Sequence, residues 1–416
     1  MLRKKRVQPS LPTRGKQPSS HQSTGTSKVT SVALFGRCDL FPWPVMIFLI
    51  RFKEKTDDRA KKDAAPDEAE QKMTHSDPRG ARCKPQFIDL FCGAGLLSYG
   101  FKTAGFRPSL ALDVDRKAIQ SYRANISKCA EVGDVSEVRD GINADVIIAG
   151  PPCQGFSTLG RRDPKDVRNE LGLSVVDWVE AIRPKIAVIE NVPGFANTEW
   201  FNLIKARLLR ADYVVQVFVL DAVDYGAAQK RTRAFTIASR VGHVECPSPR
   251  RSKARTFKDV VLNRPIKPND PMHIWPAPSP LAKQRFQAIP YMGGKRELML
   301  SRPDLCPESW SNIPGEATDV WGRIDPNSPS NTIRCSFLNP SKGRYIHPFE
   351  DRVLSLREGA RLQGIPDSWI MQGEPTPIAR QIGNGVPIPL GRAIAKTVMT
   401  AILMSRGEIP AYSAAA

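Results

Sequence analysis

From residue 86 the sequence alternates short β-branched runs with helical stretches, and this alternation limits the fold more than any other feature. Parallel strands need a crossover connection, so strands separated by helical stretches predict β-α-β units. We therefore predict an α/β fold with a doubly wound, Rossmann-like sheet. Strands are predicted at 86–91, 109–114, 145–149, 185–189, 214–220 and 234–238, and helices at 96–104, 116–126, 174–181 and 201–210.

The amino-acid composition changes along the rest of the chain, and these changes predict the domain organisation. The first 84 residues open with Arg3-Lys4-Lys5-Arg6 and continue through a Ser/Thr/Gln/Pro-rich stretch, which indicates a disordered basic extension. An alternative is that the natural chain starts at Met73 and the residues before it belong to an over-long reading frame. The predicted parts are the extension at 1–84, a catalytic and cofactor-binding domain at 85–242, a smaller irregular domain at 243–345, a C-terminal segment returning to the catalytic domain at 346–405, and a tail at 406–416.

The net charge and the cysteines of the chain indicate which binding partners and which cellular compartment to expect. The chain has 61 Lys and Arg against 42 Asp and Glu, a net charge of +19, which favours nucleic acid or an anionic membrane as partner. No run approaches the length of a membrane-spanning helix, so none is predicted. The eight cysteines show no CxxC pair and no disulfide or zinc spacing, which predicts free thiols in a reducing cytoplasm and no metal site.

A cysteine stands on a stiff turn in Pro151-Pro152-Cys153. The tripeptide follows the strand at 145–149, so Cys153 lies at the carboxyl end of a buried strand, where open α/β sheets place their ligand sites. The two prolines fix φ and remove two backbone donors. A small buried hydrophobic residue is the common role of such a cysteine, and a nucleophile is the alternative.

Two glycines and two acids predict a nucleotide-like site. Gly93 and Gly95 follow the first strand in a G-x-G-x4-G pattern that differs from the dinucleotide fingerprint. Asp113 ends the second strand, where an acid binds ribose hydroxyls. Asp134 follows a third strand end and is suited to an adenine amino group. Together these residues indicate an adenosine site without a pyrophosphate cradle, which suits S-adenosylmethionine.

With these motifs the chain resembles the bacterial type of DNA (cytosine-5)-methyltransferase, over about 87–395. The resemblance implies an S-adenosylmethionine-dependent methyltransferase sheet and a second, smaller, irregular target-recognition domain. The matching motifs, in the family's order, lie at 87–95, 150–157, 190–192, 229–233, 352–367 and 381–387.

The resemblance also implies a mechanism. The Cys153 thiolate adds to C6 of a cytosine flipped out of the duplex, which makes C5 nucleophilic enough to accept a methyl group. Glu190 holds N3 and the exocyclic amine and protonates N3, which requires a carboxyl group that is or becomes protonated. Arg233 binds O2 of the base, and Arg231 holds the nearby backbone or pocket.

Further site residues follow from the same resemblance. The loop at 158–170 is expected to be mobile and to contact phosphates, and Thr332 to lie near the flipped nucleotide. The expected cofactor-binding residues are Asp89, Phe91, Gly93, Gly95, Asp113, Val114, Asp134, Val135, Pro151, Asn384 and Val386. The expected DNA contacts are Gln154, Ser157, Arg161, Arg162, Lys165, Arg168 and Thr332.

The expected partner is double-stranded DNA, with a monomeric, cytoplasmic, nucleoid-associated enzyme that binds neither membrane nor metal. The recognition sequence and a separately encoded cognate restriction endonuclease stay open. One alternative is a tRNA cytosine-5 methyltransferase, but that branch usually shows a Cys-Phe-Thr signature, which is absent here. A second alternative, a DNA-binding module without catalysis, is disfavoured because every catalytic position that aligns is intact.

Overall fold

The structure is a computed structural model and describes residues 84–152, 170–295, 302–307, 310 and 319–410. The chain divides into two units, Met1–Ser76 and Asp77–Ala416, and the described residues belong to the second. Residues 1–83 of the predicted basic extension and residues 411–416 of the predicted tail lie outside the described part.

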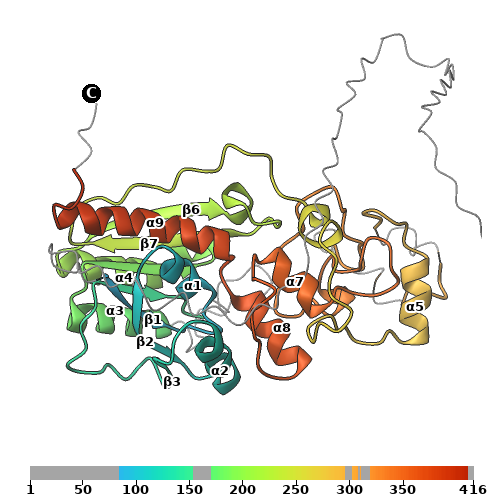
Figure 1. Cartoon of the computed structure of the whole chain (residues 1–416), viewed down its shortest axis with the longest axis horizontal. Coiled ribbons are helices and arrows are strands. Elements are labelled where there is room, and N and C mark those ends of the chain that lie inside the picture. Colours follow the sequence, from blue (N-terminus) through green and yellow to red (C-terminus); the bar gives the residue numbers. More distant parts are fainter. Residues whose placement is uncertain (1–83, 153–169, 296–301, 308–309, 311–318, 411–416) are drawn as a thin grey trace, which may run out of the picture. The chain divides into compact units, whose positions relative to one another are not determined.

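A seven-stranded sheet, in the order β3-β2-β1-β4-β5-β7-β6, forms the centre of the catalytic part (Figure 1). The first five strands pair in parallel, which confirms the predicted α/β fold. β7 runs antiparallel to both of its neighbours, a direction that the strand pattern alone did not indicate. The strands are β1 (Gln86–Leu90), β2 (Arg107–Asp113), β3 (Ala130–Val132), β4 (Val146–Ala149), β5 (Ile186–Asn191), β6 (Val214–Asp221) and β7 (Thr232–Ser239).

Helices cover both faces of the sheet, and a few further helices lie in the second part of the molecule, by which we mean the described residues between β7 and α9 (Figure 1). Their ends follow local sequence: α2, for example, begins where the Asp115 carboxylate accepts hydrogen bonds from the backbone N–H groups of Lys117 (2.8 Å) and Ala118 (3.2 Å). The α-helices are α1 (Leu96–Thr103), α2 (Arg116–Asn125), α3 (Leu171–Ile182), α4 (Glu199–Arg210), α5 (Pro280–Gln287), α7 (Leu356–Leu362), α8 (Pro375–Asn384) and α9 (Ile388–Ser405).

Alternate residues of the central strands point to opposite faces, as a pleated strand requires. Phe87, Val146 and Val188 pack in one core with side chains of α1 and α9. Ile88 and Ile147, the neighbours of two of these residues, pack in a second core with side chains of α3 and α4. The sheet therefore lies between two helical layers.

The C-terminal helix α9 packs tightly against α1. A Cβ atom on Gly100 would lie only 2.6 Å from the carbonyl carbon of Gly391, so the two helix backbones are nearly in contact. The helix α9 is long and apolar enough to cross a membrane, by length and composition alone. Its buried residues Ile394, Val398 and Ile402, however, belong to the core that it shares with α1 and the sheet, so α9 is a core helix.

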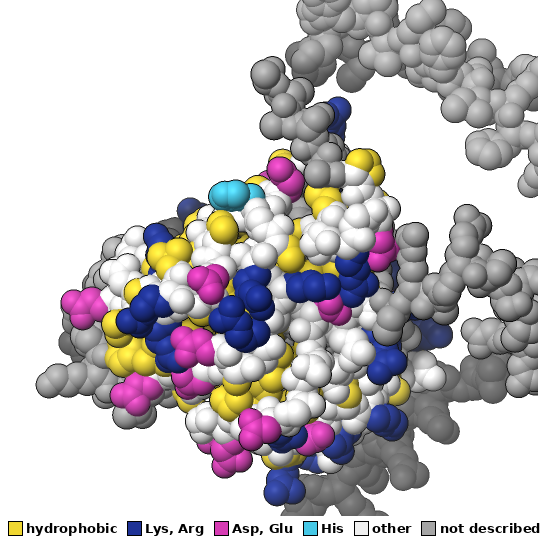
Figure 2. Space-filling model, turned by 90° about the vertical axis from the view of Figure 1, so that its left-hand side faces the viewer, with side chains coloured by type: hydrophobic (Ala, Val, Ile, Leu, Met, Phe, Trp, Pro, Cys, Tyr) yellow, Lys and Arg dark blue, Asp and Glu magenta, His cyan; other side chains and the backbone are white. Residues whose placement is uncertain are grey.

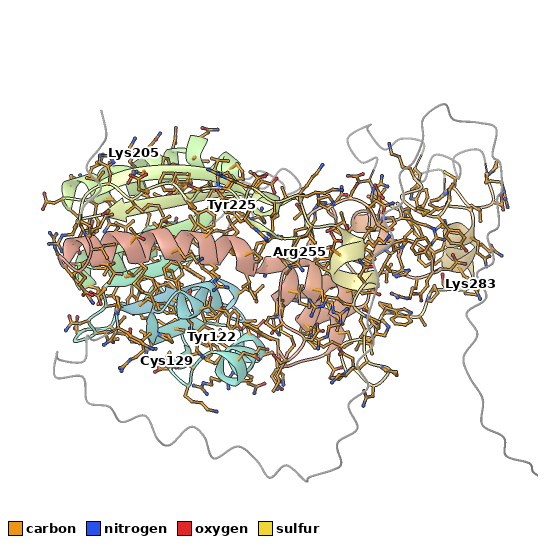
Figure 3. The ribbon with its side chains drawn as sticks, turned by 45° about the horizontal axis from the view of Figure 1, so that its top comes forward. Tyr122, Cys129, Lys205, Tyr225, Arg255 and Lys283 are labelled. Atoms are coloured by element: carbon orange, nitrogen blue, oxygen red, sulfur yellow. The ribbon has the colours of Figure 1, made fainter. Side chains whose placement is uncertain are left out.

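After β7 the chain leaves the sheet and passes through the region of Arg255 towards α5 (Figure 3). The second part has few regular elements and is organised around buried arginines, in line with its predicted irregular texture. Arg323 is fully buried and donates hydrogen bonds to the carbonyl groups of Phe286 (2.7 Å) and Ile289 (2.9 Å). Its guanidinium also forms an ion pair with Asp351 (2.5 Å). The Arg323 side chain thus joins several turns of this part that regular backbone pairing does not connect.

Candidate active site

The carboxyl ends of the parallel strands meet at one edge of the sheet. The backbone N–H of Gly150, after β4, donates to the carbonyl of Leu90 in β1 (3.2 Å). The N–H of Cys92, after β1, donates to the carbonyl of Leu112 in β2 (3.0 Å). The turn with Pro151 and the glycine loop therefore start side by side, where open α/β sheets bind ligands.

The loop between β1 and α1 is shaped by Gly93 and Gly95. Both have positive φ angles, +51° and +89°, a conformation that glycine adopts without a Cβ penalty. A Cβ atom on Gly95 would lie 2.7 Å from the Tyr122 ring, whereas one on Gly93 would meet nothing within 4 Å. Gly95 therefore allows α1 to pack closely on α2, and Gly93 leaves space open beside the loop.

Asp113 and Val114 stand next to that space. The Asp113 carboxylate accepts hydrogen bonds from the N–H groups of Gly93 (2.8 Å) and Asp115 (2.9 Å), which fix its orientation. Burial raises the pKa of Asp113, and these backbone hydrogen bonds oppose the rise. Val114 follows directly and is 71% exposed, an unusual position for a valine beside a fixed carboxylate.

Asp134 and Val135 follow β3 at the same edge. The N–H of Gly133 donates to the carbonyl of Asp113 (3.1 Å). Asp134, the next residue after Gly133, therefore lies close to the end of β2. Asp134 is exposed, and its carboxylate accepts a hydrogen bond from Ser136 (2.9 Å), which lowers its pKa. The Val135 side chain is in the core instead.

Asp89 is buried beneath the glycine loop. Its carboxyl oxygen accepts a hydrogen bond from the Ser98 hydroxyl (2.6 Å), which also lies 2.7 Å from the hydroxyl of Tyr122 (labelled in Figure 3). Burial raises the pKa of Asp89 to about 8. Asp89 is 2% exposed, and its hydrogen bond to Ser98 connects β1 to α1 beneath the glycine loop. Ser98 and Tyr122 were not predicted from the sequence, although a polar residue on the buried face of α1 indicates a buried polar partner.

Two other predicted cofactor residues frame the loop. Phe91 has a φ angle of +59°, rare for a residue with a side chain, and it directly precedes the glycine loop. Pro151 is buried at the start of the turn after β4. Both lie at the shared strand edge.

The C-terminal segment packs against the same region, at Gly385 and Val386. A Cβ atom on Gly385 would lie 2.3 Å from Leu96, the first residue of α1. Val386 is buried in the core shared with α1. Asn384 is exposed, and its side-chain oxygen accepts a hydrogen bond from the Cys335 thiol (2.6 Å). Cys335 was not among the predicted site residues, because a lone cysteine outside a motif carries little sequence signal.

Glu190 and Arg233 form an ion pair beside the turn after β4. Arg233 Nε lies 2.8 Å from Glu190 Oε1, and both side chains are mostly buried, with exposed fractions of 16% and 12%. A Cβ atom on Gly150 would lie 3.6 Å from the other oxygen, Glu190 Oε2. The carboxylate thus stands between the arginine and the chain that leads into Pro151.

Arg231 and Thr332 connect the start of β7 to later segments. The buried Arg231 guanidinium donates to the carbonyl groups of Ile333 (2.9 Å) and Gly383 (2.8 Å). The Thr332 hydroxyl donates to the carbonyl of Lys230 (2.8 Å). Arg231 thus holds backbone in place, and Thr332, about a hundred positions later in the sequence, is bonded to the residue that precedes Arg231.

The predicted nucleophile and most predicted DNA contacts lie outside the described residues. These are Cys153, Gln154, Ser157, Arg161, Arg162, Lys165 and Arg168. Their assignments stay predictions.

A pair of buried glutamines ties the site together and was missed by sequence analysis. Gln229 Nε2 donates to Gln363 Oε1 (2.8 Å) and to the carbonyl of Leu362 (3.0 Å). Gln229 Oε1 accepts from the N–H of Ile333 (3.1 Å). Both glutamines stand in motifs that were recognised, but only the fold reveals that they meet.

The charged side chains at one end of the catalytic part are of both signs (Figure 2). Figure 2 shows the face at the end of the catalytic part away from α5, where basic and acidic side chains lie side by side. Ion pairs such as Arg406 with Asp145 (3.0 Å) and Arg183 with Asp212 (3.6 Å) show how charges are balanced in the sheet domain. A surface of this kind lacks the single-sign field that attracts a polyanion.

The parallel sheet, the glycine loop and the acids at successive strand ends define an α/β methyltransferase fold. The model of the C-5 cytosine-specific DNA methylase family matches residues 85–400. The chain therefore belongs to this family and is a DNA cytosine-5-methyltransferase.

Relatives of known class agree with this assignment. The chain is 30% identical to the Type II methyltransferase M.DdeI of Desulfomicrobium norvegicum, over 75% of this chain and 88% of the relative. It is also 30% identical to the Type II methyltransferase M.XorII of Xanthomonas oryzae, over 77% and 85% of the two chains.

Solved structures share the fold. A DNA modification methyltransferase encoded within an E. coli prophage matches with a TM-score of 0.60 and 24% identity, covering 77% of this chain and 99% of the other. The methyltransferase EhMeth of Entamoeba histolytica matches with a TM-score of 0.56 and 16% identity, covering 77% and 99%.

Proposed function

We propose that the enzyme transfers a methyl group from S-adenosylmethionine to C5 of a cytosine that is flipped out of a specific duplex DNA sequence. The observation that carries the proposal is the Glu190–Arg233 ion pair, 2.8 Å across, beside Gly150. Three residues after Gly150 comes Cys153. An acid, an arginine and a thiol at one strand edge are the groups that covalent activation of a cytosine ring requires.

The cofactor fits the edge formed by β1, β2 and β3. The open space at Gly93, the fixed carboxylate of Asp113 and the exposed Val114 suit an adenosine with a ribose hydroxyl on the acid and an adenine face on the valine. Asp134 is free to accept from the adenine amino group, because it is exposed at the next strand end. When bound, S-adenosylmethionine supplies the methyl group.

Each catalytic side chain then has one task. The Cys153 thiolate adds to C6 of the base, and Glu190 delivers a proton to N3, so that the electron pair gathers at C5. Arg233 binds O2 and holds the ring against the thiol. After C5 is methylated, a base takes the C5 proton, the C5–C6 double bond forms again as the thiolate leaves C6, and N3 returns its proton to the Glu190 carboxylate, which restores the aromatic ring. Arg231 holds the backbone around these groups.

The remaining parts of the proposal concern partners. The loop at 158–170 would contact phosphates around the flipped base through Arg161, Arg162, Lys165 and Arg168. Thr332 would lie by the flipped nucleotide. We further propose a monomer acting in the cytoplasm at the nucleoid. A separately encoded endonuclease is the candidate partner, because the relatives named above are Type II methyltransferases.

A trapping experiment tests the proposal. A duplex with 5-fluorocytosine at the methylated position blocks release of the thiolate. Release requires loss of a proton from C5, and in this base C5 carries a fluorine atom in place of hydrogen. The wild type should form a denaturant-stable complex with this duplex, and Cys153→Ser should bind DNA without forming it. Turnover by Cys153→Ser would exclude Cys153 as nucleophile. Methyl transfer to total tRNA and not to duplex DNA would favour the tRNA alternative.

A further inference from the structure

Three large apolar side chains are exposed on two adjoining turns of the second part. Tyr291 is 58% exposed, Met292 55% and Phe349 44%. The N–H of Met292 donates to the carbonyl of Pro348 (3.2 Å), so the two turns lie side by side. We call these three residues the apolar tip. Grouped apolar side chains on an otherwise polar surface mark a contact surface.

The apolar tip is held in a strained conformation. Met292 has a φ angle of +59°, in the left-handed region that is unfavourable for a residue with a side chain. The following carbonyl group, of Gly293, accepts a hydrogen bond from Arg344 (2.8 Å). The guanidinium of the fully buried Arg323 lies 4.6 Å from the centre of the Tyr291 ring. Exposed side chains on a strained and anchored turn are more typical of a binding surface than of a loose loop.

Hydrogen bonds link the apolar tip to the segment that contains Thr332. Asn331, its neighbour, donates through its side chain to Asp319 (2.7 Å). Asp319 in turn accepts from Arg344 (3.3 Å), the arginine that holds Gly293. The tip therefore belongs to the same hydrogen-bonded assembly as the residue proposed to lie by the flipped nucleotide.

The acids around the apolar tip are already engaged. Glu350 pairs with Arg352 (2.8 Å), Asp351 with Arg323 (2.5 Å) and Asp319 with Arg344. Asp325, which lies against Gly293, accepts a hydrogen bond from Ser328 (2.7 Å). Lys295 is exposed three residues after Met292. Three of these four carboxylates are thus paired with arginines, which offsets their repulsion of a polyanion.

We propose that Tyr291, Met292 and Phe349 contact base edges of the duplex and help to choose the sequence that is methylated. The inference rests on the function proposed above. Apolar side chains read thymine methyl groups in the major groove or wedge between base steps, and both contacts depend on the sequence. Duplex DNA is the occupant to which we commit, because the tip is linked to the Thr332 segment and its neighbouring acids are paired.

The experiment compares methylation patterns in living cells. The wild type, Tyr291→Ala, Met292→Ala and Phe349→Ala are expressed in a host without cytosine methylation, and the methylated sequences are read by bisulfite sequencing. We expect the alanine variants to methylate sites that differ from the wild-type sequence at one position. Purified variants should lose about tenfold in kcat/KM on the wild-type site. Tyr291→Phe should keep the wild-type pattern, because it keeps the ring.

Leu203→Ala is the matched control, because Leu203 is 52% exposed on α4, in the catalytic domain. It should leave pattern and rate unchanged. Melting temperature and S-adenosylmethionine affinity of the tip variants should equal those of the wild type. Wild-type site selection in all three alanine variants would overturn the proposal. So would a lower melting temperature with unchanged site selection, because the tip would then pack on the rest of the chain. Absence of methylation by the wild type would instead refute the proposed function.

Discussion

Gln229 and Gln363, which are separated by 134 positions in the sequence, share a hydrogen bond of 2.8 Å in the interior of the protein. Gln363 also donates to the carbonyl of Ile382 (2.6 Å), so the pair links the turn before β7, the end of α7 and the end of α8. The segments that carry Arg231, Thr332 and Asn384 are thereby held in one arrangement. Buried networks of this kind are strong only when every member is bonded.

Removing one member of this network should destabilise the protein. Gln229→Ala leaves the N–H of Ile333, the carbonyl of Leu362 and the Gln363 side chain without their partner. We expect a loss of about 2–4 kcal/mol in the free energy of unfolding, measured by urea denaturation. Gln284→Ala, at an exposed position of α5, is the control and should cost less than about 0.5 kcal/mol. Equal stability of the two variants would contradict a structural role for Gln229.

Glu190→Gln should separate binding from chemistry. Glutamine retains an oxygen for the hydrogen bond from Arg233 but has no proton to deliver to N3. We expect kcat to fall by about 10²–10⁴ while affinity for S-adenosylmethionine stays within twofold. Single-turnover methylation and isothermal calorimetry measure the two quantities. Glu131→Gln, at an exposed position of β3, should retain full kcat. A wild-type kcat for Glu190→Gln would show that another group supplies the proton.

Asp89 should make the protein less stable as pH rises. Its folded pKa of about 8 is above the unfolded value near 4, so the folded state holds a proton that the unfolded state has lost between these pH values. Stability should decline across that interval by at most about 1.4 kcal/mol per pH unit from this group. Asp89→Asn keeps an oxygen for Ser98 and should flatten the decline, whereas Asp140→Asn, an exposed control, should not. Parallel pH profiles for Asp89→Asn and wild type would rule this out.

His347 should have the opposite effect on the acid side. Burial lowers its pKa to about 4, and the charges that face it are Glu350, Glu358, Arg352 and Arg323. The folded state keeps His347 neutral while the unfolded state binds a proton below about 6.5, so stability should fall as pH decreases from about 6.5 towards 4.

Thermal melting at several pH values tests this expectation. His347→Gln removes the titrating group and should reduce the pH dependence between about 4 and 6.5, by an amount of the order of 2 kcal/mol. The exposed His243→Gln variant should follow the wild type. If both variants kept the full acid dependence, the titration would belong to other groups.

Gly100→Ala should destabilise the contact between α1 and α9. Alanine favours a helix by about 1 kcal/mol over glycine, but its Cβ would lie 2.6 Å from the backbone of Gly391, so the clash should dominate. We expect a net loss of about 2 kcal/mol or more in chemical denaturation. In Gly172→Ala, in α3, the added Cβ would meet a flexible Ile204 methyl at 3.1 Å and Phe195 at an ordinary contact distance of 3.9 Å, so the change should be near neutral. A stable Gly100→Ala variant would mean that α9 can move away from α1.

Local sequence was sufficient to place Asp113, because the strand that it ends has a clear β-type pattern. Asp134 was recognised as the residue after a strand end, but the strand itself was not among the predicted ranges. β3, with three residues, is too short to produce a periodic signal, and the direction of β7 depends on pairing with β5, which is distant in the sequence. The contact between Gln229 and Gln363 depends on packing between distant segments, and the hydrophobic periodicity of one segment cannot predict it.

The packing of α9 against α1 also has a consequence for synthesis. The ribosome releases the chain from the N-terminus, so β1, α1 and the glycine loop emerge before α9. Until α9 has left the exit tunnel, the face of α1 around Gly100 lacks the partner that covers it in the folded protein. The two layers on this side of the sheet can therefore assemble only after residue 405 has been synthesised, and chains truncated before α9 should fold poorly whatever motifs they contain.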